Sequence, residues 1–152
     1  MEFMFKTDED IKIREASIND IKPVYQLQCF PSTRAYSRNV RIPSYDEHSE
    51  WMILRLGVSN VQPFYCIDYK NNKCVGVVRL DDAPFNCFEI SIYLAPHFFG
   101  KGIAKQAIRL ALLKNKGRKV IATVKRENLA SVKLFLSLGF KKINDNTYEF
   151  KK

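Results

Sequence analysis

The chain has 152 residues, of which 46% are hydrophobic and 27% are charged, and its formal net charge is +9 at pH 7. This length is typical of one domain that buries about 70% of the surface exposed by the unfolded chain. No stretch approaches the roughly 20 apolar residues of a membrane span, and the acidic start lacks the pattern of a signal peptide. We therefore expect a single domain over 1–152, located in the cytoplasm and without membrane contact.

The first predicted elements are a strand and a helix. Apolar and polar residues alternate over 11–17, as in a half-buried strand. Either Ser17 or Asn19 can cap the following helix, which we expect to run to about Phe30 and to end at Pro31.

A polar and basic stretch over 31–43 predicts a loop. After it, Ser44 and Glu47 have the spacing of a capping box, which predicts the beginning of a second helix. We expect this helix to end before Gly57, with the left-handed backbone that commonly stops helices.

The middle of the chain predicts three strands. Those over 64–69 and 73–80 flank two asparagines at 71–72, a pair typical of a hairpin turn. A third strand follows over 88–94, where apolar and polar residues again alternate.

The remaining pattern alternates helices and strands. Asn128 can cap the last helix and Gly139 can stop it. We predict a helix over 102–116, a strand over 119–124, a helix over 128–138 and a closing pair of strands around 145–146. The whole order predicts a mixed α/β sheet with helices on both faces.

The positive charge is concentrated in one segment. Residues 98–126 contain nine lysines and arginines and no acidic residue, whereas the remainder holds 16 basic and 16 acidic residues. Such a segment suits a polyanion, either a nucleic acid or a phosphorylated small molecule. It is also compatible with a solvated, lysine-rich helix face.

The four cysteines lie far apart in the sequence, without a C-x-x-C pair or histidines at zinc-site spacing. We interpret them as buried free thiols of a reducing compartment, and we expect no bound metal. They are Cys29, Cys66, Cys74 and Cys87.

A turn of Gly100, Lys101 and Gly102 connects the 88–94 strand to the basic helix. Such a junction gathers free backbone amides and the positive end of the helix dipole, which together form an anion site. Two common phosphate loops do not match, because one requires a glycine where Lys105 stands and the pattern of the other is absent. A pyrophosphate site and a plain structural turn remain the two interpretations.

Two motifs within 88–140 resemble those of the GNAT superfamily of acetyl-CoA-dependent N-acetyltransferases. The family's pyrophosphate motif, Gln/Arg-x-x-Gly-x-Gly/Ala, is occupied by residues 97–102. Here His97 replaces the usual Gln or Arg, and Phe99 stands where a basic residue is frequent. The second motif, Asn-x-x-Ala/Ser followed by an aromatic residue and Leu-Gly-Phe, is matched by Asn128, Ser131, Phe135 and 138–140.

The resemblance implies a central mixed, mainly antiparallel sheet, with 11–87 mainly on the acceptor side and 88–140 as the acetyl-CoA-binding core. It implies that backbone groups of Ile92 and Leu94 bind the pantetheine arm and that amides over 99–104 bind the pyrophosphate. The coenzyme-binding residues expected on this basis are Ile92, Leu94, Phe99, Gly100, Lys101, Gly102, Ile103, Ala104, Asn128, Ser131 and Phe135.

The chemistry implied by the family raises a question at Phe135, because many GNAT enzymes have a tyrosine there that protonates the departing thiolate. Deprotonation of the acceptor is the harder demand, since a lysine-like amine with a pKa of roughly 10.4 is almost wholly charged at neutral pH. Glu89 is the candidate base, directly or through water, or else a structural carboxylate. Tyr93, on the same strand face, is the candidate acid or else a core or groove residue.

The acceptor side carries a thinner signal. Residues 37–56 and 75–81 look like the small acetyltransferases that act on nucleotide-linked amino sugars. Each candidate can also be a charged surface residue without a partner, and His48 can be a surface histidine beside a core tryptophan, Trp51. The residues expected to bind the acceptor are Arg38, His48, Arg79 and Asp81, with Arg34 beside them.

Other functions stay open. A small-molecule amine is the expected acceptor and partner, with a protein N-terminus or lysine as the alternative, in a monomer or homodimer. A nucleic-acid-binding module is disfavoured, because the 102–116 helix carries a wide apolar stripe that must face a core. An acyl-CoA sensor without activity is compatible with the missing tyrosine.

Overall fold

The computed structural model describes residues 9–151, and within this range seven strands form one sheet in the order β1-β2-β3-β4-β5-β7-β6. Neighbouring strands are antiparallel, except that β4 and β5 run parallel. The strands are β1 (Ile11–Glu15), β2 (Phe64–Tyr69), β3 (Asn72–Ala83), β4 (Cys87–Leu94), β5 (Val120–Thr123), β6 (Lys141–Lys142) and β7 (Thr147–Phe150).

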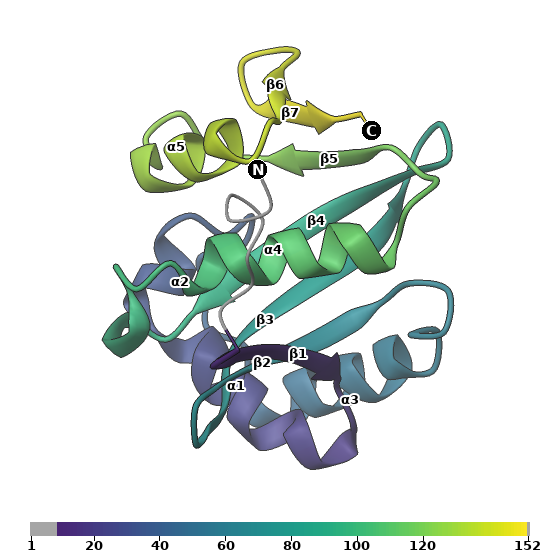
Figure 1. The fold of residues 1–152 in the computed structure, drawn as a ribbon. Helices are drawn as coiled ribbons and strands as arrows, with labels where there is room; N and C mark the ends of the chain where they lie inside the picture. The colour runs from purple at the N-terminus through teal and green to yellow at the C-terminus, as the bar shows by residue number, and fades with distance from the viewer. Residues whose placement is uncertain (1–8, 152) are drawn as a thin grey trace.

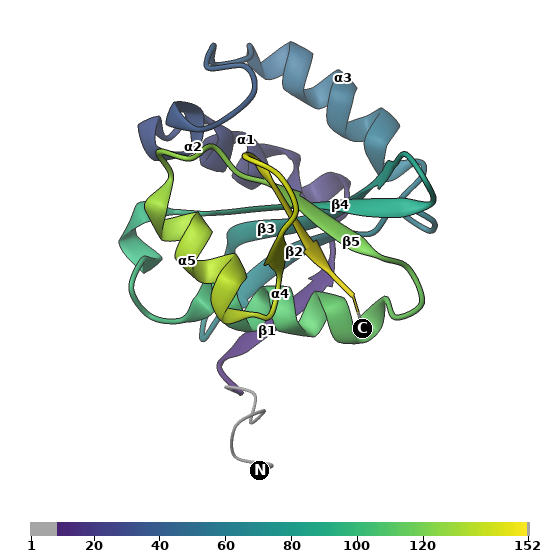
Figure 2. The ribbon, with the colours of Figure 1, turned by 90° about the horizontal axis from the view of Figure 1, so that it is seen from above.

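Helices cover both faces of the sheet (Figure 1). Figure 2 shows α1, α2 and α3 on one face and α4 and α5 on the other. Their bounds are α1 (Ile21–Cys29), α2 (Pro31–Ala35), α3 (Tyr45–Leu56), α4 (Ile103–Lys114) and α5 (Leu129–Ser137), with short 3₁₀ turns η2 (Ile18–Asp20) and η3 (Pro96–Phe98). None of the helices within 9–151 has the length and apolar character needed to cross a bilayer. The predicted mixed, mainly antiparallel sheet with helices on both faces is confirmed.

Alternate residues of the central strands pack into separate cores on the two faces. On the side of α1 and α3, Phe64, Cys66 and Val77 pack with Val24 and Met52. Fully burying a side chain of this size contributes about 1.5–3 kcal/mol, which holds the helices to the sheet. The core on the side of α4 and α5 includes Val78, Leu80, Ile90, Ile108, Val120 and Phe135.

Both helix starts predicted in the N-terminal half are confirmed. Ser17, rather than Asn19, is the cap, and it caps the 3₁₀ turn η2 that leads into α1: its hydroxyl accepts from the Asn19 N–H, and the Asp20 carboxylate accepts from the Ser17 N–H. Ser44 and Glu47 form the expected capping box, with distances of 3.1 and 2.8 Å. These reciprocal bonds satisfy amides that have no partner inside a helix.

Two local expectations are wrong. The stretch 31–43 is not all loop, because α2 begins at Pro31; proline suits the first helical position, where its fixed φ is already correct and no N–H is needed. Gly57 is not left-handed: its φ is −61°, and its N–H donates to the carbonyls of Ile53 and Leu54. The helix therefore ends in a right-handed turn, whose backbone conformation does not call for glycine.

The sheet opens between β4 and β5. The two strands pair only at Phe88 with Val120 and at Glu89 with Ile121, while β4 continues to Leu94. On its other side β4 pairs with β3 along its whole length. The edge of β4 beyond Glu89 therefore faces a gap, and this gap positions the candidate site.

Candidate active site

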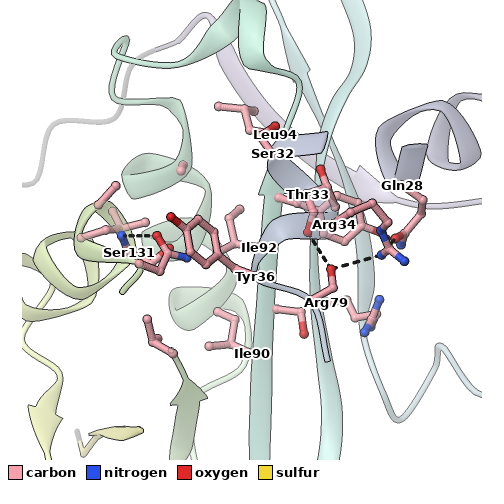
Figure 3. A pocket seen from close by; sticks show the side chains of 18 of the residues that line it. Gln28, Ser32, Thr33, Arg34, Tyr36, Arg79, Ile90, Ile92, Leu94 and Ser131 are labelled. Atoms are coloured by element: carbon pink, nitrogen blue, oxygen red, sulfur yellow. Dashed lines mark hydrogen bonds between the residues drawn. The ribbon is translucent and has the colours of Figure 1, made fainter. Parts of the chain in front are cut away.

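A cavity of about 980 Å³ lies where β4 and β5 part. Figure 3 shows Gln28, Arg34 and Arg79 on one side of it, Ser131 on the other, and Ile90 and Ile92 between them. The sequence-predicted residues that line it are Arg34, Arg38, His48, Arg79, Glu89, Ile92, Tyr93, Leu94, Phe99, Gly100, Gly102, Ile103, Ala104, Asn128, Ser131 and Phe135. Lys101 and Asp81 do not line it. The cavity thus joins the two halves of the predicted site.

The glycine turn at the beginning of α4 has an unusual backbone. Gly100 and Gly102 have φ of +76° and +75°, a conformation that side chains rarely tolerate. A Cβ added at either position would meet no atom within 4 Å, so the conformation rather than lack of space calls for glycine. Gly102 is the N-cap of α4, and no side chain within residues 9–151 caps the helix. Its first amides therefore have no partner within the helix.

This turn fits a diphosphate. Uncapped amides and the helix dipole favour an anion at the N-terminus of a 12-residue helix. Lys105 and Lys125 contribute positive charge to the cavity lining, whereas Lys101 is exposed outside it. The gap beside the free edge of β4 continues from the turn into the cavity, so that backbone groups near Ile92 are available to an extended ligand.

The beginning of α5 forms the opposite wall. The Asn128 Oδ1 atom accepts from the Ser131 N–H at 3.3 Å, which confirms Asn128 as the N-cap. Phe135 borders the cavity and is also buried against Phe140, with 5.0 Å between the ring centroids. Its ring therefore belongs to the core as well as to the cavity wall.

Glu89 is ion-paired. Its carboxylate accepts a short hydrogen bond from the Arg38 guanidinium, although the Arg38 side chain is 75% exposed and that of Glu89 only 20%. The hydrogen bond raises the pKa of Arg38 above its ordinary value. Arg38 lies in the strap, residues 36–43, which connects α2 to α3 across the cavity. Lys125 ties the strap to the far wall by donating to the Ser37 carbonyl at 3.2 Å.

Tyr93 is held in the neutral form. Burial raises its pKa to about 12, so its hydroxyl keeps its proton at neutral pH. Gln28, on α1, donates to the Tyr93 oxygen at 2.7 Å. The phenolic proton therefore points away from Gln28 and is available to another acceptor.

Arg34 organises the strap. Its guanidinium donates to the carbonyls of Asn39 and Arg41 at 3.1 and 2.9 Å, and to the Gln28 and Ser37 side chains at 2.7 and 3.2 Å. An arginine with four acceptors of its own chain is a structural residue of the site. The sequence carries no signal for this role, because the path of a loop decides which carbonyls an arginine reaches.

Arg79 is oriented from two sides. Its guanidinium lies 5.1 Å from the centroid of the Trp51 ring, and its Nε donates to Asp81 at 3.0 Å. Asp81 also accepts from Arg55, so it acts on the cavity through Arg79 rather than from its lining.

The expected burial of His48 and Trp51 is reversed. His48 is only 3% exposed and shares a hydrogen bond of 2.9 Å with the Ile21 carbonyl through Nε2, while Trp51 is 38% exposed. Burial lowers the pKa of His48 below its ordinary value, so the ring is neutral at physiological pH. Trp51 presents a flat surface to the cavity, so the alternative that His48 and Trp51 share a helix face bordering the acceptor site fits the structure better than a core tryptophan does.

Comparisons with known protein families and sequences identify relatives of this chain. The family model described as acetyltransferase (GNAT) domain matches residues 10–141. An uncharacterized protein of Methanocaldococcus jannaschii is 31% identical over an alignment of 142 residues that covers 89% of this chain and 29% of that protein. The chain thus spans less than a third of the length of this relative.

Solved structures have the same fold. A domain from Methanocaldococcus jannaschii is 29% identical, with a TM-score of 0.79 over 94% of this chain and 99% of that one. A spermidine N-acetyltransferase from Vibrio cholerae, in complex with CoA and spermine, is 19% identical, with a TM-score of 0.77 over 93% and 94%. Because the family model covers 10–141, the chain belongs to the acetyltransferase (GNAT) family, which confirms the resemblance of its motifs and the expected cofactor, acetyl-CoA.

Proposed function

We propose that this chain transfers the acetyl group of acetyl-CoA to a primary amine on a small acceptor that also carries an anionic group, specifically a nucleotide-linked amino sugar. The observation that carries the proposal is the charge of the acceptor half of the cavity. Arg34, Arg38, Arg41 and Arg79 line it, against the carboxylates of Glu47 and Glu89.

Both carboxylates already have arginine partners. Glu47 pairs with Arg41 at 3.0 Å, and Glu89 pairs with Arg38. A polyamine would therefore find no unpaired carboxylate among the described residues of the lining. An anionic acceptor is favoured, because four arginines against two carboxylates leave this half of the cavity with a net positive charge, and Arg79 has guanidinium N–H groups that are not used by a carboxylate.

Arg79 is the proposed anion-binding residue. Stacking on Trp51 and the bond from Nε to Asp81 hold the guanidinium plane, and the two Nη groups are the ones free to act as a fork. Such a fork matches phosphate or carboxylate with two parallel hydrogen bonds. The exposed ring of Trp51 beside it offers a surface on which a sugar or base can pack.

The glycine turn and the β4 edge are the proposed donor site. Amides over 99–104 would hold the diphosphate, and the backbone of Ile92 and Leu94 would hold the pantetheine arm, with Asn128 and Ser131 on the other side. When bound, acetyl-CoA supplies an acetyl thioester, which is the electrophile of the reaction.

Glu89 is the proposed base. The amine arrives charged, and Glu89 accepts its proton, directly or through water, once the Arg38 guanidinium has moved aside. Base help of this kind is worth roughly 10²–10⁴-fold in rate. Tyr93 is the proposed acid for the departing thiolate, because it is neutral at physiological pH and Phe135 has no proton to give.

A panel of acceptors tests the proposal. The purified chain is incubated with acetyl-CoA and four amines: a nucleotide-linked amino sugar, the same amino sugar without the nucleotide, spermidine and a peptide with a free N-terminus. Release of CoA is expected to be fastest with the first, and Arg79→Ala should remove most of its advantage over the second. Turnover of the peptide or of spermidine alone would refute the choice of acceptor. The absence of binding heat with CoA and acetyl-CoA would refute the enzymatic activity as a whole.

A further inference from the structure

Two of the cysteines lie side by side on the α1 face of the sheet, and neither lines the cavity between β4 and β5. The Sγ atoms of Cys66, in β2, and Cys74, in β3, are 3.3 Å apart, with the Cys74 thiol donating. The sequence interpretation, which saw four separated thiols, did not bring any two of them together.

A bulge in the hairpin creates this proximity. β2 and β3 begin in a register that pairs Cys66 with Val77, and continuing it would place Cys74 opposite Tyr69, whose side chain lies on the other face. Instead the register shifts before Tyr69, and Cys74 moves to the face of Cys66.

The backbone at Cys74 is unusual for a residue with a side chain. Its φ is +52°, in the left-handed region, and the Asp68 Oδ1 atom accepts from its N–H at 2.8 Å. Such a conformation costs roughly 1–2 kcal/mol outside glycine, so the surrounding contacts hold the thiol in a position that the chain alone does not favour.

Only one of the two thiols can be reached. Cys74 is 6% exposed and lines a second cavity of about 350 Å³, which is bordered by α1, the β2–β3 turn and Phe98. Cys66 is 0% exposed and does not line this cavity. The hydrogen bond from Cys74 and burial raise the pKa of the Cys66 thiol, so Cys66 stays protonated until a partner reacts with it.

A metal ion is disfavoured at this position. Asp20 lies close enough to both sulfurs to complete a set of three ligands. However, its two oxygens already accept from Nη1 and Nη2 of Arg14 at 2.9 and 3.0 Å and from the Ser17 N–H at 2.8 Å. A cation would have to displace a guanidinium from that carboxylate and then lie beside it.

We propose that Cys66 and Cys74 form a thiol–disulfide site that a hydroperoxide oxidises in the folded protein. Cys74, reached through the second cavity, attacks one peroxide oxygen, becomes a sulfenic acid and releases water or an alcohol. The Cys66 sulfur then attacks the Cys74 sulfur, and the Cys66 proton leaves with the hydroxyl group of the sulfenic acid as water. Each sulfur loses one electron, the peroxide oxygens gain two, and one S–S bond replaces two S–H bonds.

Mass spectrometry of the native chain tests the proposal. Trypsin cleaves after Lys70 and Lys73, so Cys66 and Cys74 fall on separate peptides, 56–70 and 74–79. After hydrogen peroxide treatment of folded protein and blocking of the remaining thiols, we expect these two peptides to be joined, with the loss of two hydrogens. Cys29 and Cys87 should carry the blocking group, and adding a reducing agent should separate the joined peptides.

Variants and a denatured control make the outcome specific. Cys87→Ser should still give the joined peptides. In Cys74→Ser, Cys66 should remain a thiol and therefore carry the blocking group. Oxidation of Cys29 before the pair, or a 66–74 link that appears only after unfolding in denaturant, would overturn the proposal. Binding of zinc by the untreated chain, lost in Cys66→Ala, would also overturn it in favour of a metal site.

Discussion

Replacing Glu89 by glutamine tests the proposed base with little disturbance of the fold. The substitution keeps the shape of the side chain, and the hydrogen bond from Arg38 can still be made to the amide oxygen. What it removes is the site that accepts a proton from the acceptor amine. We expect kcat to fall by roughly 10²–10⁴-fold, which corresponds to about 3–5 kcal/mol in the activation barrier.

The structural cost of the same change is small. Arg38 is mostly exposed, and ion pairs of this kind contribute about 0–1 kcal/mol. For a domain of this size, that loss lowers Tm by at most about 4 °C. The expected loss of rate is therefore several times larger in free energy than the expected loss of stability, so unfolding cannot account for it.

A second variant separates the two roles of Glu89. Arg38→Met breaks the same ion pair but leaves the carboxylate in place. Steady-state assays of CoA release, with acetyl-CoA affinity followed by calorimetry, should give a loss of kcat below tenfold for Arg38→Met, with its main effect on the KM of the acceptor. Equal losses of kcat in both variants would show that the ion pair holding the strap matters, and the base assignment would be refuted.

Three further changes give distinct results. Gly102→Ala places a Cβ at φ +75°, which should lower the free energy of unfolding by about 1–2 kcal/mol and weaken acetyl-CoA binding in calorimetry. The control Gly117→Ala, at φ +107° and outside the cavity lining, should lower Tm comparably without changing the affinity. Equal losses of affinity in the two variants would contradict the assignment of the turn. Phe135→Tyr should keep or raise kcat while lowering Tm, because a buried hydroxyl without a partner costs about 1–3 kcal/mol; a severe loss of kcat in folded protein would mean that the ring does not border the thioester. The hydrogen bonds from Arg14 and Ser17 outweigh burial and lower the pKa of Asp20, so its contribution is present above the ordinary pKa of about 3.8 and is lost as pH falls. Asp20→Asn should therefore reduce Tm by about 4–8 °C at pH 7 and by clearly less near pH 3 in thermal melts, and an equal reduction at both values would contradict this.

Local rules accounted for much of the fold because the decisive residues are neighbours in sequence. The capping box at Ser44 and Glu47 and the cap at Asn128 depend on residues three positions apart. Hairpin turns likewise depend on two or three consecutive residues. The alternation over 88–94 predicted which side chains of β4 share a face, and Glu89 and Tyr93 do line the cavity together.

Features that depend on contacts between distant segments could not be predicted in this way. The pairing of Arg38 with Glu89 joins residues 51 apart, and only the path of the strap makes it possible. The burial of His48 and the exposure of Trp51 were reversed because α3 has apolar residues on its solvent side, including Ile53 and Leu54, which blurs the periodicity. The contact between Cys66 and Cys74 depends on a register shift between β2 and β3, which residue composition does not predict.

The short seam between β4 and β5 has a consequence for the order of events on the enzyme. Because only two residue pairs join β4 to β5, the C-terminal part of the fold, with β5, β7 and α5, is paired with the rest of the sheet only near the beginning of β4. A donor bound along the unpaired edge of β4 would make the backbone hydrogen bonds that β5 does not make there, so the coenzyme would complete the structure before it reacts. The acceptor chamber would then gain its full wall only after the donor has entered, which favours sequential kinetics with the thioester first.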